Sequence, residues 1–270
     1  MLAAILPGSR QRRVTSATPR GARKFRSGRA SLATAAARAA PAGGTLAAGS
    51  PREAAISADK ASSWVYAQDF VVEDDVLLRA RERAAQLGTD AVLPGTGATL
   101  AVLAAAVDAR TAVEVGTGTG VASLYLLRGM PEAGVLTTID PEVEHQRAAK
   151  DAFAEAGVRA TRTRAISGRA LDVLPRLTDA AYDLVLLGRP ALEGSHADAV
   201  AHVEQAVRLL RTGGVLAVDH ALWHDRVSDP ARRDEATTTV REIGRLVRDD
   251  ERLLPALLPV GDGLLVAVRR

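Results

Sequence analysis

The chain has 270 residues, of which 47% are hydrophobic and none is cysteine. This length supplies one sizeable core, and the lack of cysteine excludes disulfides and thiolate metal sites. No run approaches the roughly 18 apolar residues that a membrane helix needs, so we expect a soluble, cytoplasmic protein with no membrane partner.

The formal charge of +3 combines two parts of opposite sign. Residues 1–60 hold 11 Lys and Arg against two acidic residues, which gives +9, and the 24 basic and 30 acidic residues beyond them give −6. The second part is therefore mildly acidic. It lacks the basic footprint of a nucleic-acid-binding domain, and we expect no nucleic-acid partner.

Residues 1–62 are rich in Ala, Arg, Ser, Gly and Pro and show no sustained apolar period. This composition predicts a disordered basic tail in front of a folded domain over residues 63–270. Two functions stay open for the tail, a polyanion-binding arm or a targeting peptide. An upstream extension without fixed structure is the simpler interpretation.

The folded part begins with two helices, and strands and helices then alternate. Apolar residues at helical spacing predict helices near 76–87, where Gly88 ends the first, and 98–108. We expect strands at 111–115, 135–139, 161–166, 182–187 and 215–218. We expect the intervening and following helices at 119–129, 142–156, 169–177, 195–211 and 231–248. Two last strands, near 253–260 and 263–268, flank a hairpin signal. The alternation predicts an α/β fold, with a mostly parallel sheet, helices on both faces and an antiparallel last strand.

The first strand ends in the glycine-rich segment Glu114-Val-Gly-Thr-Gly-Thr-Gly120. In such sheets ligands bind beyond the carboxyl ends of the strands, and glycines allow a sharp turn and close approach of a ligand to the backbone. Asp140 ends the second strand, where a carboxylate suits the two hydroxyls of a ribose. These residues predict a nucleoside-containing cofactor, although glycine-rich turns also recur for packing reasons alone.

The spacing of the glycines separates two cofactors. A dinucleotide fingerprint requires a third glycine at the position that Val121 holds here. A carboxylate at Glu114 would repel a pyrophosphate, whereas it tolerates the positive charges of S-adenosylmethionine. The segment therefore favours S-adenosylmethionine, and an NAD(P)-binding oxidoreductase is the alternative from another class.

From about Trp64 to the C-terminus the chain resembles bacterial members of the O-methyltransferase family that includes catechol and caffeoyl-CoA O-methyltransferases. The matching stretches are Ala112-Val-Glu-Val-Gly-Thr-Gly118, Leu136-Thr-Thr-Ile-Asp140, Ile166-Ser-Gly-Arg-Ala-Leu-Asp-Val-Leu-Pro175, Tyr182-Asp-Leu-Val-Leu-Leu187, Leu210-Arg-Thr-Gly-Gly-Val-Leu216, Asp250-Glu-Arg-Leu-Leu-Pro255 and Gly261-Asp-Gly-Leu-Leu265. The resemblance implies a Rossmann-like seven-stranded sheet, a homodimer, and methyl transfer from S-adenosylmethionine to a hydroxyl of a small molecule.

The resemblance also implies a set of cofactor contacts. They run from the methionine end to the adenine, with Asp140 at the ribose: Val92, Glu114, Gly116, Thr117, Gly118, Asp140, Gly168, Arg169 and Ala170. The family has a serine eight residues after the glutamate of the glycine-rich segment, where this chain has Ala122. Ser123, one residue later, is the candidate for that contact.

A departure from the family concerns the metal. Relatives that methylate catechols hold a divalent ion with an aspartate after one strand and an Asp-Asn pair after the next, and these positions are Gly188 and Asp219-His220 here. One aspartate and one histidine are a poor ligand set for Mg²⁺, which prefers several oxygens. We therefore predict no catalytic metal. A softer ion on Asp219, His220 and His224 is the alternative.

Without a metal, the acceptor hydroxyl needs a base. We predict that His220 is this base and that Asp219 orients it or contacts the substrate, with His224 as second choice. The simpler interpretation is a loop histidine that is exposed to water. A further alternative, motivated by Gly188 and Ala122, is a relative that binds the cofactor but has lost catalysis. The remaining histidines are expected on solvated helix faces: His145, His196 and His202.

Overall fold

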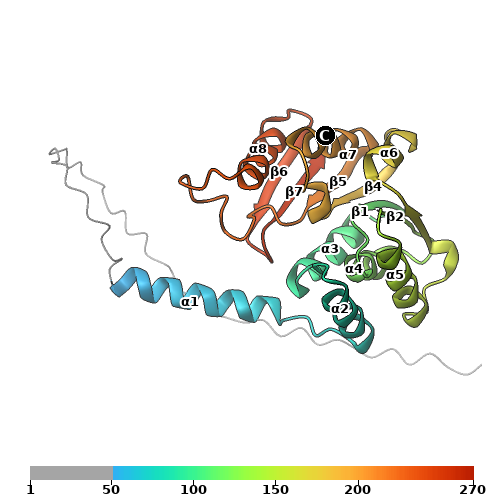
Figure 1. Ribbon diagram of the computed structural model, residues 1–270, viewed down its shortest axis with the longest axis horizontal. Coiled ribbons are helices and arrows are strands. Elements are labelled where there is room, and N and C mark those ends of the chain that lie inside the picture. Colours follow the sequence, from blue (N-terminus) through green and yellow to red (C-terminus); the bar gives the residue numbers. More distant parts are fainter. Residues whose placement is uncertain (1–50) are drawn as a thin grey trace, which may run out of the picture. The chain divides into compact units, whose positions relative to one another are not determined.

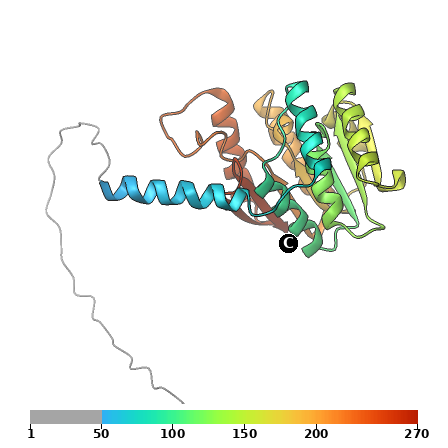
Figure 2. The same ribbon diagram turned by 90° about the horizontal axis from the view of Figure 1, so that it is seen from below.

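The computed structural model describes residues 51–270, with side chains from residue 59 onward. Most of the predicted disordered tail therefore lies outside the described residues. Helix α1 covers Pro51–Gln68, so the domain boundary that we placed after residue 62 falls inside it. No apolar period predicted this helix, because every described residue of α1 except Gln68 is exposed. Figures 1 and 2 show α1 joining the fold at its C-terminal end, where the Gly95 N–H donates to Gln68 Oε1 at 3.0 Å.

Seven strands form one sheet in the order β3-β2-β1-β4-β5-β7-β6 (Figure 1). The strands from β3 to β5 are parallel, and β7 is antiparallel to both of its neighbours. Their bounds are β1 Thr111–Val115, β2 Val135–Asp140, β3 Thr163–Ser167, β4 Tyr182–Leu187, β5 Leu210–Val218, β6 Leu253–Leu258 and β7 Leu264–Arg269. The predicted mostly parallel sheet with an antiparallel last strand is confirmed.

Helices α2 to α5 cover one face of the sheet, and α6 to α8 cover the other (Figure 1). The bounds are α2 Asp75–Leu87, α3 Pro94–Ala106, α4 Val121–Gly129, α5 Val143–Glu155, α6 Ala170–Val173, α7 His196–Leu209 and α8 Glu235–Asp249. Short 3-10 turns are η1 Ala160–Arg162, η2 Leu174–Arg176 and η3 Arg189–Ala191. Within residues 51–270, no helix has the length and apolar character needed to cross a bilayer.

The sheet separates two hydrophobic cores, because neighbouring residues of a strand point to opposite faces. In β1, Ala112 packs into the core under α2 to α5, whereas Val113 and Val115 pack into the core under α7 and α8. Glu114 belongs to the same face as Ala112. The alternation thus directs its carboxylate toward α4, beneath the glycine-rich turn.

Two helices begin or end at other residues than the sequence predicted, for local chemical reasons. Asp234 caps α8, since its carboxylate accepts from the Thr237 N–H at 3.0 Å, and the helix begins there rather than at 231. The predicted helix over 169–177 is shorter. It is α6 followed by the 3-10 turn η2, because Pro175 lacks the N–H that would continue an α-helix.

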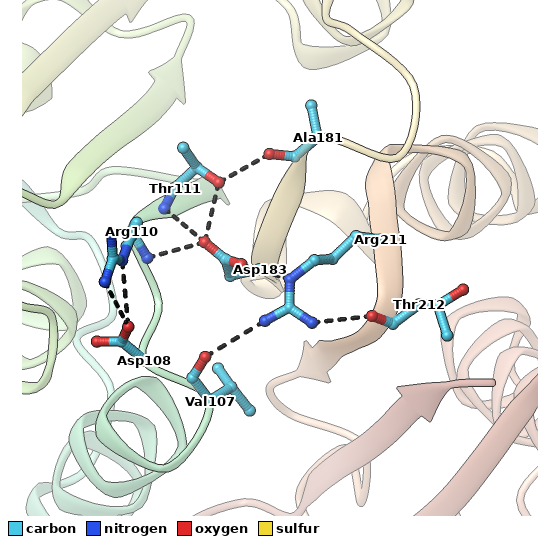
Figure 3. A network of polar contacts seen from close by, with 8 residues as sticks. All are labelled: Val107, Asp108, Arg110, Thr111, Ala181, Asp183, Arg211 and Thr212. Carbon is cyan, nitrogen blue, oxygen red and sulfur yellow. Dashed lines mark hydrogen bonds and ion pairs between the residues drawn. The ribbon is translucent and has the colours of Figure 1, made fainter.

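A partly buried carboxylate joins three strands near their amino ends, on the side of the sheet opposite the glycine-rich turn. Figure 3 shows Asp183 of β4 accepting from the backbone N–H groups of Arg110 and Thr111, each at 2.8 Å, and from Arg211 Nε at 2.6 Å. Arg110 and Thr111 lie at the start of β1 and Arg211 lies in β5. Asp183 thus fixes the amino ends of β1 and β4 against β5.

Candidate active site

A cavity of about 380 Å³ lies at the carboxyl ends of the parallel strands. This volume is within the range of about 300 to 1,000 Å³ that is usual for small-molecule sites. Its walls come from segments far apart in the sequence, at 88–92, 116–119, 121–122, 140–142, 145, 186, 188–190, 193 and 219–220. The predicted cofactor residues Val92, Gly116, Thr117, Gly118 and Asp140 all line it, as do Asp219 and His220.

All three glycines of the turn have positive φ, and Gly116 and Gly118 are the two that line the cavity. Gly116 and Gly118 have φ of 92° and 50°, in the left-handed region that side chains disfavour. A Cβ on Gly116 would also lie 2.9 Å from Pro190 Cδ, on the far wall of the cavity. The bare backbone therefore lets the end of β1 pass close to the end of β4.

Asp140 is held ready to accept hydrogen bonds inside the cavity. Its carboxylate accepts from the N–H groups of Gly118 and Glu142, each at 2.9 Å, and the residue is 3% exposed. His145 Nδ1 lies 3.2 Å from Asp140 Oδ1. The prediction of a solvated helix face is wrong for His145, which lines the cavity from the first turn of α5, and for His202, which is buried on α7. The position of His145 is the one that bears on the site. Its place directly after the β2–α5 turn is the signal that could have revealed it.

Glu114 and Ser123 do not line the cavity. Both are 0% exposed, and the Ser123 hydroxyl donates to Glu114 Oε2 beneath the glycine-rich turn. Ala122, at the place where the family has serine, is the α4 residue that faces the cavity together with Val121. Ser123 therefore lies behind Glu114 and does not line the cavity, and its contact with a cofactor stays a prediction.

The predicted adenine segment lies beside this cavity without lining it. The Gly168 N–H donates to the backbone oxygen of Asp140 at 3.0 Å, which joins the ends of β2 and β3. Arg169 precedes α6, and Ala170 begins it and is nearly buried. Contact of these three residues with an adenine stays a prediction.

The predicted catalytic pair follows β5 and is nearly buried. The Asp219 N–H donates to Leu187 O at 3.0 Å, which ties it to the end of β4. His220 has φ of 60°, and its Nδ1 lies 3.0 Å from Asp219 Oδ2, a close contact that lacks the alignment of a hydrogen bond. Burial alone would lower the pKa of the His220 imidazole, but the carboxylates of Asp219 and Asp262 raise it above its ordinary value.

A second, smaller cavity adjoins the first. It has a volume of about 210 Å³ and is lined by Asp90, Ala91, Leu93, Asp219, His220, His224 and Asp262. Asp219 and His220 thus border both cavities. His224 borders only the smaller one, and its side chain is half exposed.

Arg189, just after β4, belongs to a charged group at the wall of the larger cavity. Its guanidinium pairs with Asp90 and, at 2.8 Å, with Glu193, and it lies 5.7 Å from the centre of the Trp223 ring. Asp90 belongs to the loop before α3, so the pair connects that loop to the end of β4. Nothing in the sequence pattern places Asp90 and Arg189 together.

Gly188 occupies the position where metal-binding relatives have an aspartate. A Cβ there would lie 2.8 Å from the backbone oxygen of Val115, closer than real side chains approach. The described part of the chain also contains no group of three or more His, Cys, Asp or Glu side chains arranged to hold a metal ion. The residues present therefore do not fit the metal site of those relatives.

Comparison with known proteins gives one consistent result. The family described as O-methyltransferase matches residues 67–270. A protein of Mycobacterium sp. (strain JLS) that bears an O-methyltransferase name is 52% identical over 204 residues, which cover 76% of this chain and 90% of that protein. A crystal structure from Corynebacterium glutamicum is 35% identical, with a TM-score of 0.70, and covers 78% of this chain and 97% of that chain. The O-methyltransferase TomG of Streptomyces achromogenes, solved in complex with S-adenosylmethionine, is 30% identical with a TM-score of 0.67 and covers 77% and 96%.

These matches confirm the predicted seven-stranded methyltransferase fold and the predicted dependence on S-adenosylmethionine, and they give no support to a nicotinamide oxidoreductase. The carboxylate-rich cavity and its glycine-rich turn suit a cationic nucleoside cofactor. The chain belongs to the O-methyltransferase family.

Proposed function

We propose that this enzyme transfers a methyl group to a hydroxyl of a small molecule without a catalytic metal, and that His220 is the general base. One observation carries the proposal: Asp219 and His220 lie in the wall that the larger and the smaller cavity share, together with Asp90 and Ala91 of the loop before α3. We place the cofactor in the larger cavity and the acceptor in the smaller. In this arrangement the imidazole stands where the two reactants meet.

The chemistry divides between cofactor and protein. S-adenosylmethionine supplies an activated methyl group and a sulfur leaving group. The protein aligns the acceptor and removes its proton. The Nδ1 face of His220 is turned to Asp219, which leaves Nε2 to take the proton of the acceptor hydroxyl. The Asp219 carboxylate then stabilises the imidazolium that forms.

The absence of a metal step is supported by the donor set. Gly188 offers no ligand and no room for one, since Val115 O stands where a side chain would begin. Asp219 alone is an inadequate site for Mg²⁺, which prefers several oxygen ligands in octahedral geometry. The imidazole of His220 then replaces the metal as the means of producing an acceptor oxyanion.

Replacement of the base tests the proposal. His220→Gln is expected to lower kcat by about 10² to 10⁴-fold, the usual contribution of a general base, while the Kd for S-adenosylhomocysteine stays within about twofold. The assay is transfer of labelled methyl groups to a panel of phenols and catechols, with Mg²⁺ and with EDTA. His196→Gln is the matched control, because this histidine of α7 lines neither cavity and its side chain is half exposed.

Two outcomes would contradict the mechanism. Unchanged turnover in His220→Gln would remove the imidazole from the reaction, and loss of activity in EDTA that Mg²⁺ restores would show a metal-dependent enzyme. A wild-type enzyme that binds S-adenosylhomocysteine but methylates no acceptor in a broad panel would favour the alternative of lost catalysis.

A homodimer and a cytoplasmic location remain parts of the proposal. Around the end of α1 the exposed side chains include Tyr66 (71%), Phe70 (72%) and Val72 (88%). A cluster of large apolar side chains in water is typical of a surface that a protein covers. We expect a second copy of the chain to cover it, and light scattering of the purified protein measures whether the particle has the mass of one chain or two.

A further inference from the structure

A fully buried carboxylate lies under the cofactor turn with one oxygen unpaired. Glu114 Oε2 accepts from the hydroxyls of Ser123 and, at 2.6 Å, Thr138, whereas Oε1 has no hydrogen-bond partner. Glu114 is 0% exposed. A buried polar atom without a partner is unfavourable and rare, so its retention here points to a state of the protein in which it is used.

The hydrogen bonds connect this carboxylate to the wall of the cofactor cavity. Thr138 Oγ1 lies 2.7 Å from Thr117 Oγ1, and Thr117 lines the cavity. Gln146 Nε2 in turn donates to Thr117 Oγ1 at 3.0 Å and to Ile166 O at 3.1 Å. A chain of buried side chains thus joins Glu114 to the turn that a cofactor would contact.

The surroundings of Glu114 contain no positive partner among the described residues. Ser123 on α4 and Thr138 on β2 are neutral, and Leu186 is its register partner on β4. The charged group that acts on it is Asp140, at the end of β2, and His145 is in contact with Asp140. Burial raises the pKa of Glu114 to about 7, with Asp140 adding to the increase and the two hydroxyls opposing it.

We propose that Glu114 carries a proton on Oε1 in the empty protein and releases it to solvent when the amino-acid end of the donor binds. The proposal rests on the cofactor site described above. The amino-acid end brings an ammonium group to the turn that follows Glu114, and in a site of low dielectric a nearby positive charge favours the ionised carboxylate. The carboxyl O–H bond breaks, the proton passes to buffer, and the ammonium keeps its own protons.

Proton release gives binding a pH dependence of known sign. Only the ionised form would bind the ammonium well, so affinity should rise with pH until Glu114 is fully ionised in the empty protein. For a group that titrates near pH 7, the ionised fraction increases about tenfold between pH 6 and pH 8, and the apparent Kd should fall about tenfold over the same range.

Titration calorimetry in two buffers of different ionisation enthalpy measures the released proton without turnover. S-adenosylhomocysteine, which has the ammonium group, should release about half a proton per site at pH 7. 5′-Methylthioadenosine has the same nucleoside and thioether but no amino acid, and its binding should release none. With Glu114→Gln, binding of S-adenosylhomocysteine should release no proton and lose its dependence on pH.

A second variant tests the proposal independently, in case Glu114→Gln fails to fold. Ser123→Ala keeps the carboxylate and removes one of its two donors, which should move the midpoint of the pH dependence upward. Release that persists in Glu114→Gln, equal release with 5′-methylthioadenosine, or equal affinity for S-adenosylhomocysteine at pH 6 and pH 8 would overturn the proposal. Failure of the wild-type protein to bind S-adenosylhomocysteine at all would instead overturn the cofactor site itself.

Discussion

The network around Asp183 should contribute strongly to stability, and Asp183→Asn is the change that tests it. The carboxylate receives hydrogen bonds on both oxygens: Arg211 donates to Oδ1, and the backbone of Arg110 and Thr111 donates to Oδ2 (Figure 3). An asparagine side chain has one oxygen and one NH₂ group. Whichever way it is oriented, one set of donors loses its acceptor.

The expected loss follows from these contacts. Asp183 is 13% exposed in its side chain, and hydrogen bonds to charged groups contribute about 1.5 to 3 kcal/mol each, so we expect a loss of about 2 to 3 kcal/mol. For a domain of this size that corresponds to a decrease in Tm of roughly 4 to 12 °C. Burial would raise the pKa of this carboxyl, but the hydrogen bonds from Arg211 and the β1 backbone outweigh it and hold the pKa below its ordinary value. The contribution of ionised Asp183 to the free energy of unfolding is therefore present above about pH 4. It is lost as the pH falls through the lowered pKa of this carboxyl in the folded state.

Urea unfolding of the two proteins between pH 2 and pH 8 measures this difference. Asp108→Asn is the matched control, since Asp108 is drawn in the same network but its side chain is 65% exposed and contacts only Arg110. We expect the control to change stability by less than about 0.5 kcal/mol, as for most surface substitutions. The reasoning fails if both variants lose the same stability, or if the deficit of Asp183→Asn is undiminished at pH 2.

Two further predictions concern helix packing and turnover. Gly97→Ala should destabilise the protein by about 1 to 3 kcal/mol, because a Cβ on α3 would lie 2.3 Å from the Tyr125 ring. Gly244→Ala on α8 is the control: an added Cβ there would meet no atom within 4 Å, so we expect a neutral or slightly stabilising effect when both variants are measured by thermal unfolding. If His220 is the base, kcat should rise with pH through an apparent pKa above the ordinary value of about 6.5, because its neighbouring carboxylates stabilise the protonated ring. A kcat that is constant from pH 6 to pH 9 would contradict that role.

The residues that could be predicted from the sequence are those whose place follows from the end of a strand. Gly116, Asp140 and Asp219 each follow or end a parallel strand, and such strands present their carboxyl ends at one edge of the sheet, so their meeting in one cavity was foreseeable. Predicting which faces of the strands and helices pack together required only the periodicity of the apolar residues.

The residues that were missed depend on rotations and loop paths. Ala122 and Ser123 differ by one position on α4, which turns a side chain by about 100° and separates a cavity wall from a buried carboxylate. Asp90 reaches Arg189 through the path of the loop before α3, which no local pattern specifies. One-dimensional spacing therefore located the site but not the partners of its charged groups.

This chain differs from metal-binding relatives at Gly188 and at His220, and the two differences have one physical connection. With Gly188, the end of β4 lies against the backbone of Val115, and a side chain there would require the neighbouring backbone to shift. A lone Asp219 would then be a nearly buried anion with no cation to neutralise it, which is an expensive arrangement. The imidazole of His220 supplies that positive charge on protonation, and the same pairing raises its pKa, so the group that compensates Asp219 is also the group that takes up a proton. In the proposed mechanism, the lack of a metal and the use of His220 as base are thus linked through the charge of one aspartate.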